Sequence, residues 1–418
     1  MTMKKALYVT GACLTRNTSA NLSHNGFVQG LLEAGYDLDI IMADESWGEE
    51  DRALPRWEQA HYYEFRAASF SDRLRKAYKT AENHSAAGGG TRRETEVPAG
   101  RGRLSFQQRL RQTVKTLFYK IFPKDPVYPL ERVWLKNACR FKSGQLYDLV
   151  VSNSSPAAGH KLVSELKRRR QIRCKRWVQI WEDPWFFDLY GGHSERIRQE
   201  EAALLRAAGE VYYVSPVTLY YQKQYFPESA EKMKSIPLPY FAFGNENKES
   251  PSGSKKSYGY FGDYFSQTRN LLPFYEALLD SGRSGSIIGD SDLRLDGTAQ
   301  IRVSGRITLD LLEPIQDAAD VLVHLCNLRG GQIPGKIYHY SATAKPILFI
   351  LDGTEEEKKM IREYFGPYNR YYFCENDAEE IRKCMERIER DDRTFSPVEA
   401  FSPVRVIDRI ITKEQARL

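Results

Sequence analysis

A glycine-containing stretch that leads into a lysine could hold a phosphate group. The apolar run Val321–Leu325 predicts a buried parallel strand, and Gly330 and Gly331 let the chain turn after it. Pro334 then suits the start of a helix with Lys336 in its first turn, because the N–H that proline lacks is not needed there. Backbone N–H groups and the positive end of a helix dipole favour an anion at such a place. A solvated lysine in an ordinary βαβ unit is the alternative.

Two further candidate residues follow predicted strands in the first half of the chain. The strand Asp148–Ser152 leads through a polar turn into a helix, Ala157–Arg170, that carries His160. The strand Trp177–Trp181 ends beside Asp183. Ligands bind at the carboxyl ends of parallel strands, so both side chains are candidates for catalysis. The alternatives are a hydrogen-bonded core histidine for His160 and a helix cap for Asp183.

The elements that must position these residues alternate between strand and helix from the start of the chain. A strand at Ala6–Thr10, a polar loop at Leu14–His24, a helix at Gly26–Ala34 closed by Gly35 and a strand at Asp37–Met42 form a βαβ opening. The loop after the first strand has no G-x-G-x-x-G sequence, so dinucleotide binding there has little support.

A second βα series follows a linker that starts at Ile236–Pro239 and continues through a polar, glycine- and serine-rich segment. Its predicted strands are Ser257–Gly262, Ser286–Gly289, Ile301–Gly305, Val321–Leu325, Pro346–Leu351 and Arg370–Cys374, and its predicted helices include Thr308–Ala319, Thr354–Phe365 and Ala378–Glu389. Two doubly wound α/β domains are therefore the expected architecture. We expect the first domain to span residues 1–240 and the second to span residues 241–400. A C-terminal helix in 401–418 follows, and one arrangement open to it is packing back on the N-terminal domain.

Length and composition agree with a globular protein of two domains. The chain has 418 residues, 41% hydrophobic and 28% charged, with a net charge of +6. Six scattered cysteines without a Cys-x-x-Cys pair suggest reduced core residues of a cytosolic protein. The sequence has neither a secretory signal nor an apolar run of about 18 residues, so we expect a soluble protein that can bind a membrane surface.

A basic segment interrupts the first domain. Ser69–Arg103 is rich in glycine and small polar residues, which predicts a mobile insertion. The following Ser105–Lys124 has apolar residues at helical spacing, and Arg101–Lys124 contains seven basic residues and no acidic one. This composition is typical of a helix that lies in the surface of an anionic membrane. A domain helix with a solvated basic side is the alternative, and nucleic acid is disfavoured because no known binding module surrounds the segment.

Several segments, in this order, resemble the retaining GT-B glycosyltransferases of the group 1, or family 4, type, in the subgroup that makes bacterial surface polysaccharides such as capsule and O-antigen. The resemblance covers nearly the whole chain except the insertion. Its carriers are Tyr147–His160, Glu182–Trp185, Arg206–Pro216, Gly259–Asn270, Gly305–Leu325 and Gly330–Leu348.

The resemblance implies roles for single residues. Arg269 and Lys336 match the family's cations that hold the donor diphosphate, and His160 matches a histidine near the transferred sugar. Asp183 matches an acidic position on the acceptor face. Glycines after strands, Gly262 among them, would let the donor approach the backbone closely. No metal or cofactor is implied beyond the nucleotide-sugar co-substrate, because the two cations supply the positive charge.

The sequence departs from the family pattern at two donor-site positions. The family has two glutamates, eight positions apart, where this chain has Gly331 and His339. A histidine can still hydrogen-bond a ribose hydroxyl, whereas glycine has no side chain to offer. The loop after the first strand also lacks the family's glycine-rich turn, with Thr18–Asn21 in its place.

The resemblance implies a transferase that moves a sugar from a nucleotide donor, expected to be a UDP-sugar, to a lipid-linked or polysaccharide acceptor. It would work at the cytoplasmic face of the cell membrane, held there by the Ser105–Lys124 helix. Two alternatives remain open: a UDP-amino-sugar epimerase, and a catalytically degenerate protein that binds nucleotide or glycan as an assembly partner.

Overall fold

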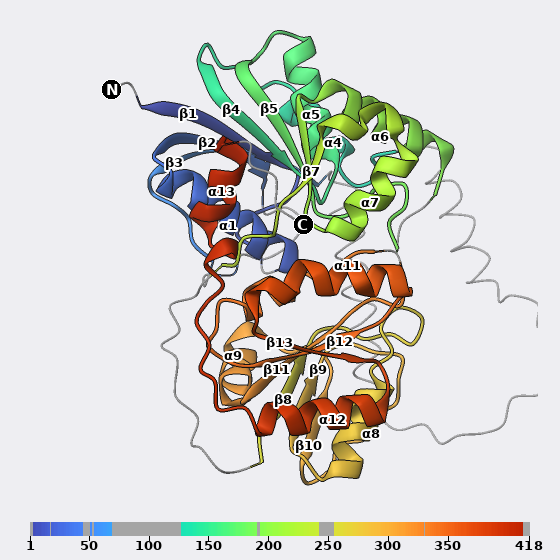
Figure 1. The fold of residues 1–418 in the computed structure, drawn as a ribbon. Helices are drawn as coiled ribbons and strands as arrows, with labels where there is room; N and C mark the ends of the chain where they lie inside the picture. Colours follow the sequence, from blue (N-terminus) through green and yellow to red (C-terminus); the bar gives the residue numbers. More distant parts are fainter. Residues whose placement is uncertain are drawn as a thin grey trace, which may run out of the picture.

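The computed structural model describes residues 3–16, 18–44, 51, 54–68, 127–189, 193–241, 255–329 and 331–412. The predicted insertion at 69–103, the basic helix at 105–124 and Gly330 lie outside these ranges. The described residues form two parallel sheets, one in each half of the chain, with helices on both faces of each (Figure 1). The α/β fold class predicted from the sequence is confirmed.

The N-terminal sheet has seven parallel strands in the order β3-β2-β1-β4-β5-β6-β7. Its central strands are buried on both faces because helices cover both sides, which is why they appear as continuous apolar runs in the sequence. The strand order reverses between β1 and β4. The strands are β1 (Lys4–Thr10), β2 (Tyr36–Ala43), β3 (Ala60–Phe65), β4 (Leu146–Asn153), β5 (Arg173–Trp181), β6 (Glu210–Tyr213) and β7 (Met233–Ser235).

The C-terminal sheet has six parallel strands in the order β10-β9-β8-β11-β12-β13. Here the order reverses between β8 and β11, so a crevice is expected outside the carboxyl ends of these two strands. The strands are β8 (Tyr258–Phe261), β9 (Gly285–Ile288), β10 (Ile301–Ser304), β11 (Val321–Leu325), β12 (Ile347–Leu351) and β13 (Tyr371–Glu375).

Side-chain caps start several of the helices. The Thr354 hydroxyl accepts from the Glu357 N–H while the Glu357 carboxylate accepts from the Thr354 N–H, which satisfies two donors at the start of α11. No helix in the described ranges is both long and apolar enough to cross a membrane. The helices are α1 (Ser19–Glu33), α4 (Arg132–Ala138), α5 (Ala158–Arg168), α6 (Glu195–Ala207), α7 (Pro216–Tyr225), α8 (Leu272–Ser281), α9 (Leu309–Ala318), α10 (Lys336–Tyr340), α11 (Glu355–Phe365), α12 (Ala378–Glu389) and α13 (Pro403–Thr412).

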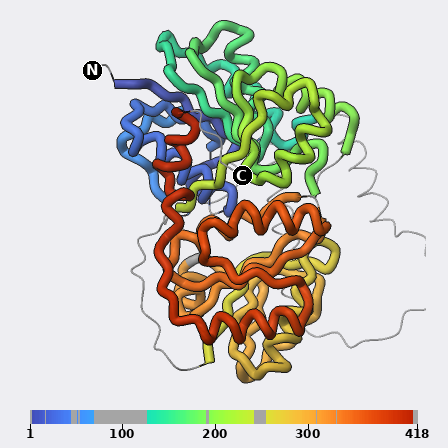
Figure 2. The backbone as a smooth tube through the Cα atoms, viewed as in Figure 1, coloured from blue at the N-terminus to red at the C-terminus, as the bar shows by residue number. Residues whose placement is uncertain are grey.

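The C-terminal helix α13 returns to the N-terminal half of the molecule and packs against α1 (Figure 2). The contact is close: a Cβ on Gly30 would lie 2.3 Å from the carbonyl oxygen of Pro403. Arg176 fixes the other end of α13 by donating to the carbonyls of Ile410, at 2.8 Å, and Ile411, at 3.3 Å. The last helix is therefore part of the N-terminal core although it follows the C-terminal sheet in sequence.

The structure differs from the sequence-based elements mainly at α1. The predicted polar loop at Leu14–His24 is wrong in its second half, because Thr18 caps a helix that begins at Ser19. Four polar side chains of this helix are buried, so a search for apolar spacing missed its first two turns; they are Asn21, Ser23, His24 and Asn25. The elements β3, α4, α7 and β7 were not predicted.

Candidate functional site

A cavity of about 430 Å³ lies where the carboxyl ends of the C-terminal strands face the N-terminal domain. The ends of β8 and β11 form one wall, at the point where the strand order reverses, and the start of α10 forms another. Thr18 and Ser19 reach the cavity from the start of α1. Of the residues predicted from the sequence, those that line it are Gly262, Arg269, Pro334 and Lys336.

Lys336 is a cation in a poorly hydrated position. Burial lowers its pKa from 10.5 to about 8, with Arg306 and Arg269 adding to the fall and Asp263 opposing it. No hydrogen bond or ion pair joins its ammonium group to another described residue. Its aliphatic chain lies against the backbone of Gly262, where a Cβ would stand 3.9 Å from Cδ. A desolvated ammonium group in a cavity favours an anionic ligand, which would replace the lost hydration.

Two more cations reach the same cavity. Arg269 lies next to Tyr260, and its charge opposes the effect of burial that raises the tyrosine pKa to about 12. Arg306 pairs with Asp263 and lies 3.8 Å from the carboxylate of Asp290. The three cations come from three separate segments, namely the loop after β8, the loop after β10 and the start of α10. Their convergence gives the cavity a positive lining opposed by Asp263.

His324 is a cavity residue that sequence reasoning did not single out. It lies on β11, and burial lowers its pKa to about 3, helped by the charge of Arg269, so the ring is neutral. Its Nε2 has no hydrogen-bond partner among the described residues. The signal was present in the sequence, because His324 is the one polar residue in the otherwise apolar strand Val321–Leu325.

Gly331 docks on the N-terminal domain and does not line the cavity. Its carbonyl oxygen accepts from the hydroxyls of Ser215, at 2.8 Å, and Thr218, at 3.2 Å, at the start of α7. Its φ of +68° favours glycine, and a Cβ would lie 2.8 Å from a methyl group of Val217. The glutamate that the family has at this position could not be accommodated without moving α7. Glycine at this position is therefore explained by its positive φ and by its packing against α7.

Asp183 belongs to the same contact between the domains. The amide nitrogen of Gln332 donates to the carboxylates of Asp183, at 2.6 Å, and Asp188, at 3.1 Å, and its amide oxygen accepts from the N–H of Leu189. Burial raises the pKa of Asp183 to about 6, and the neighbouring charge of Asp188 acts in the same direction. One glutamine side chain therefore joins two carboxyl groups across the domain boundary.

His160 is buried in the N-terminal core, with 0% exposure, and it does not line the cavity. Its Nδ1 lies 2.8 Å from the Ser152 hydroxyl, which also accepts from the indole N–H of Trp177, at 2.9 Å. The ring packs 4.3 Å from that of Trp181. Burial lowers the pKa of His160 to about 3, so it is neutral at physiological pH.

His339 also lies away from the cavity lining. Its Nδ1 accepts from the backbone N–H of Phe241, at 3.2 Å, in the segment that connects the two domains. An accepting Nδ1 places the proton of the neutral ring on Nε2. Burial lowers the pKa of His339 to about 4. The side chain therefore anchors the connection between the domains.

A buried polar network lies at the carboxyl edge of the N-terminal sheet, close to His160. The Tyr8 hydroxyl lies 2.7 Å from Nδ1 of His24 and accepts from the amide of Asn153, which also donates to Glu182 at 3.4 Å. Burial raises the pKa of Glu182 well above its usual range and lowers that of His24 to about 3. Nε2 of His24 lies 3.6 Å from the carboxyl group of Glu182, so the network joins the ends of neighbouring strands to α1.

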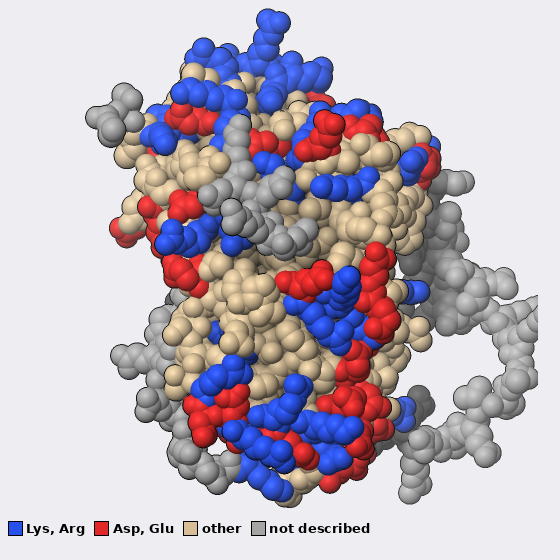
Figure 3. All heavy atoms as spheres, viewed as in Figure 1, with Lys and Arg blue, Asp and Glu red and all other residues tan. Residues whose placement is uncertain are grey.

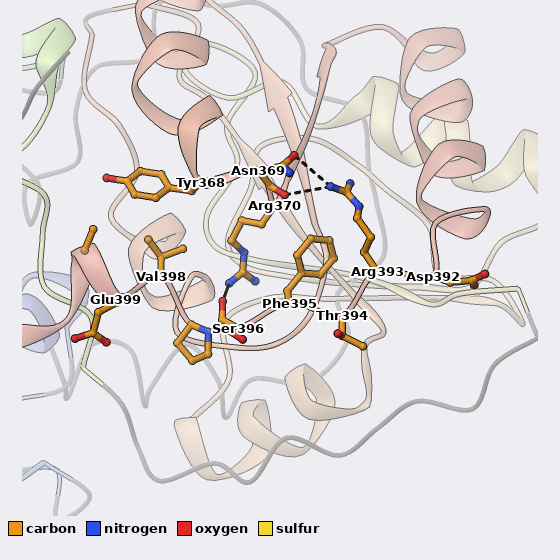
Figure 4. Close-up of a pocket in the computed structure, with 12 residues that line it drawn as sticks. Tyr368, Asn369, Arg370, Asp392, Arg393, Thr394, Phe395, Ser396, Val398 and Glu399 are labelled. Atoms are coloured by element: carbon orange, nitrogen blue, oxygen red, sulfur yellow. Dashed lines mark hydrogen bonds between the residues drawn. The ribbon is translucent and has the colours of Figure 1, made fainter.

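A larger hollow, of about 750 Å³, lies on the outer side of the C-terminal domain (Figure 4). Its cations are engaged by the protein itself. Arg370 is 2% exposed and donates to four carbonyl groups, including that of Ser396, while Arg393 donates to Asn369 and Asp391. This hollow lies where the chain after α12 runs along the edge strand β13, and the cavity between the domains remains the candidate site.

Two doubly wound parallel sheets that face each other across a cavity define the GT-B class of fold, as expected from the sequence. No protein-family model and no curated protein sequence matches the chain. Among solved structures, the catalytic domain of starch synthase IV from Arabidopsis thaliana, bound to ADP and acarbose, has a TM-score of 0.57 at 10% identity and covers 99% of this chain and 96% of its own.

Two other structures give the same result. Sucrose-phosphate synthase from Thermosynechococcus elongatus has a TM-score of 0.53 at 13% identity, over 97% of this chain and 94% of its own. A glycosyltransferase from Rickettsia africae ESF-5 has a TM-score of 0.50 at 10% identity, over 99% and 98% of the two chains. The chain therefore has the GT-B fold of these glycosyltransferases over nearly its whole length.

Proposed function

We propose that the protein is a retaining, metal-independent glycosyltransferase that uses a nucleotide-sugar donor, with a UDP-sugar as the expected donor. The observation that carries this proposal is the convergence of Lys336, Arg269 and Arg306 on one cavity between the two sheets. A nucleoside diphosphate matches that lining in charge. The starch synthase of the same fold was solved with ADP bound, which agrees with this assignment.

The cations would act mainly as the bond between sugar and diphosphate breaks. Negative charge then grows on the departing phosphate, and fixed cations stabilise it more in the transition state than in the bound donor. Lys336 is suited to this role because its ammonium group has already lost much of its hydration. His324, which is neutral and has an unpartnered Nε2, can offer a hydrogen bond at the same wall of the cavity.

On the acceptor side we retain Asp183 and His160 as the proposed residues. The Gln332 amide donates to Oδ1 of Asp183, so an acceptor hydroxyl that bound this oxygen would replace a contact between the two domains. With a pKa near 6, the carboxyl group is ionised at physiological pH and able to accept a proton.

We further propose a lipid-linked or polysaccharide acceptor in bacterial surface glycan synthesis, with the protein held at the cytoplasmic face of the membrane. This rests on the basic amphipathic sequence Ser105–Lys124 and on the family resemblance of the N-terminal half.

The test is nucleotide release from a panel of nucleotide sugars, with and without membrane extract. Release that requires the extract and is lost in Lys336→Ala supports transfer. Lys359→Ala, a change at an exposed lysine of α11, serves as the control. Tight nucleotide binding without turnover under every condition would contradict the proposal.

A further inference from the structure

A dense group of exposed cations covers the amino end of the N-terminal sheet, away from the cavity. Figure 3 shows lysine and arginine side chains gathered at the end of this domain that lies farthest from the C-terminal domain. We call this group the basic end surface. Its exposed members are Arg140, Lys142, Arg168, Arg169, Arg170, Arg173 and Lys175.

Two loops build this surface, and hydrogen bonds hold them together. The Gln171 side chain donates to the carbonyls of Cys139, at 3.1 Å, and Phe141, at 3.0 Å, while the backbone carbonyl of Gln171 accepts from the N–H of Ser143. Arg173 donates to the carbonyl of Gly144 at 2.9 Å. The segment before β4 and the turn between α5 and β5 therefore form one continuous, fixed surface.

Few carboxylates balance this charge. Glu165 pairs with Arg168 and Arg169, and Asp148 pairs with Lys175. Arg140, Lys142 and Arg170 make no ion pair with any residue that the structure describes. Exposed ion pairs of this kind contribute little to stability, so folding does not require so many like charges at one end of a sheet.

We propose that the basic end surface docks on an anionic membrane. A bilayer offers many phosphates in a plane, which matches cations spread over the end of a sheet. Leu146, 47% exposed at the start of β4 and in register with Arg173, places an apolar side chain among them. Single-stranded nucleic acid is a poorer match because it stacks on exposed aromatic rings, and Phe141, the one aromatic residue of 139–146 and 167–176, is buried.

This docking constrains the acceptor, a step that rests on the proposed function. The surface lies at the amino ends of the strands and the cavity lies beyond the carboxyl ends. The eight residues of β4 separate these ends by roughly 25 Å at about 3.3 Å per residue. An acceptor hydroxyl must therefore stand well above the bilayer, as the growing end of an oligosaccharide does and the first sugar on a lipid phosphate does not.

Vesicle sedimentation of the full chain tests the docking without any need for turnover. The variant Arg140→Gln, Lys142→Gln, Arg170→Asn removes three cations that make no described ion pair, and asparagine suits the φ of +55° at position 170. At about fivefold per cation near an anionic surface, binding to vesicles with 30 mol % phosphatidylglycerol should fall about a hundredfold. Unchanged thermal unfolding would show that the variant is folded.

The control variant removes three exposed cations of the C-terminal domain, Arg294→Gln, Arg302→Gln and Lys359→Gln, and should bind within threefold of the unmodified protein. Equal losses in the two triple variants would overturn the proposal, since net charge alone would then explain binding. The proposal would also be overturned if the first variant bound the vesicles as well as the unmodified protein does while the variant Arg109→Glu, Arg111→Glu, Lys115→Glu was released from them. Tighter binding to polyglutamate than to vesicles would assign the surface to an acidic protein instead.

Discussion

Replacement of Lys336 by alanine should weaken binding of UDP, and the loss should depend on pH. The ammonium group lies in the cavity without a described partner, and burial lowers its pKa to about 8. A diphosphate bound beside it would favour the protonated form and raise this pKa. Binding then takes up a proton when the solution is more alkaline than about pH 8, so affinity falls as the pH rises through that value.

The size of the effect follows from these values. A hydrogen bond to a charged group contributes about 1.5–3 kcal/mol, so Lys336→Ala should raise the Kd about 10- to 150-fold at pH 7. In the unmodified protein, a rise from pH 8 to pH 9 should weaken binding by up to about tenfold, because one pKa unit corresponds to about 1.4 kcal/mol. The phosphate itself does not interfere, since its second ionisation, near pH 6, is complete in this range.

Titration calorimetry with UDP at pH 7, 8 and 9 measures both effects. Lys336→Ala should show the weaker affinity and no dependence on pH, whereas Lys359→Ala should behave as the unmodified protein does, because Lys359 is 74% exposed on α11. An affinity of Lys336→Ala within twofold of the unmodified protein, or a flat pH profile of the latter, would refute the assignment of Lys336 to the diphosphate.

Three further predictions concern two contacts between the domains and the packing of α13 on α1. Gly331→Glu should lower the free energy of unfolding in urea by about 2–5 kcal/mol, because position 331 has a positive φ and no space for a side chain. A variant as stable as the unmodified protein would contradict the contact of Gly331 with α7. Gly30→Ala should cost about 1–3 kcal/mol because α13 blocks its Cβ, whereas Gly366→Ala, which meets nothing within 4 Å, should be nearly neutral. The folded-state pKa of Asp183 is raised to about 6, so stability from this group is greatest in acid and is lost as the pH rises through 6. Asp183→Asn should therefore be more stable than the unmodified protein at pH 8, by up to about 3 kcal/mol, and similar to it at pH 4. If the two proteins had the same dependence of stability on pH, the carboxyl group would not be desolvated by the Gln332 contact.

The apolar strands were predictable because their signal is local. Strands such as β11 and β12 are buried on both faces, so five consecutive apolar or nearly apolar residues identify them without knowledge of their neighbours. Lys336 was singled out by its place in the first turn of a helix after two glycines, the role of Arg269 came from the family resemblance, and the structure brings both to one cavity. The apolar strand before Asp183 predicted its place at the carboxyl edge of the sheet, whereas its bond to Gln332 was not predicted.

The remaining features depend on contacts between distant segments. Nothing near Gly331 in the sequence shows that its carbonyl will meet Ser215, more than a hundred positions away. The start of α1 was missed because its buried side chains are polar and bond to backbone groups, as Asn21 and Asn25 do. His324 was hidden for the opposite reason, since a single histidine in an apolar strand leaves the strand pattern intact.

The return of α13 to the N-terminal domain also determines how the two halves can move. In the described residues, the segment that follows β7 and the segment that precedes α13 lie side by side, because the N–H of Tyr240 donates to the carbonyl of Phe401 at 3.0 Å. A bond between these two segments favours rotation of the domains about a hinge close to them. We expect the contacts of Gln332 and Gly331 with the N-terminal domain to be among those that break when the domains rotate apart and the cavity opens.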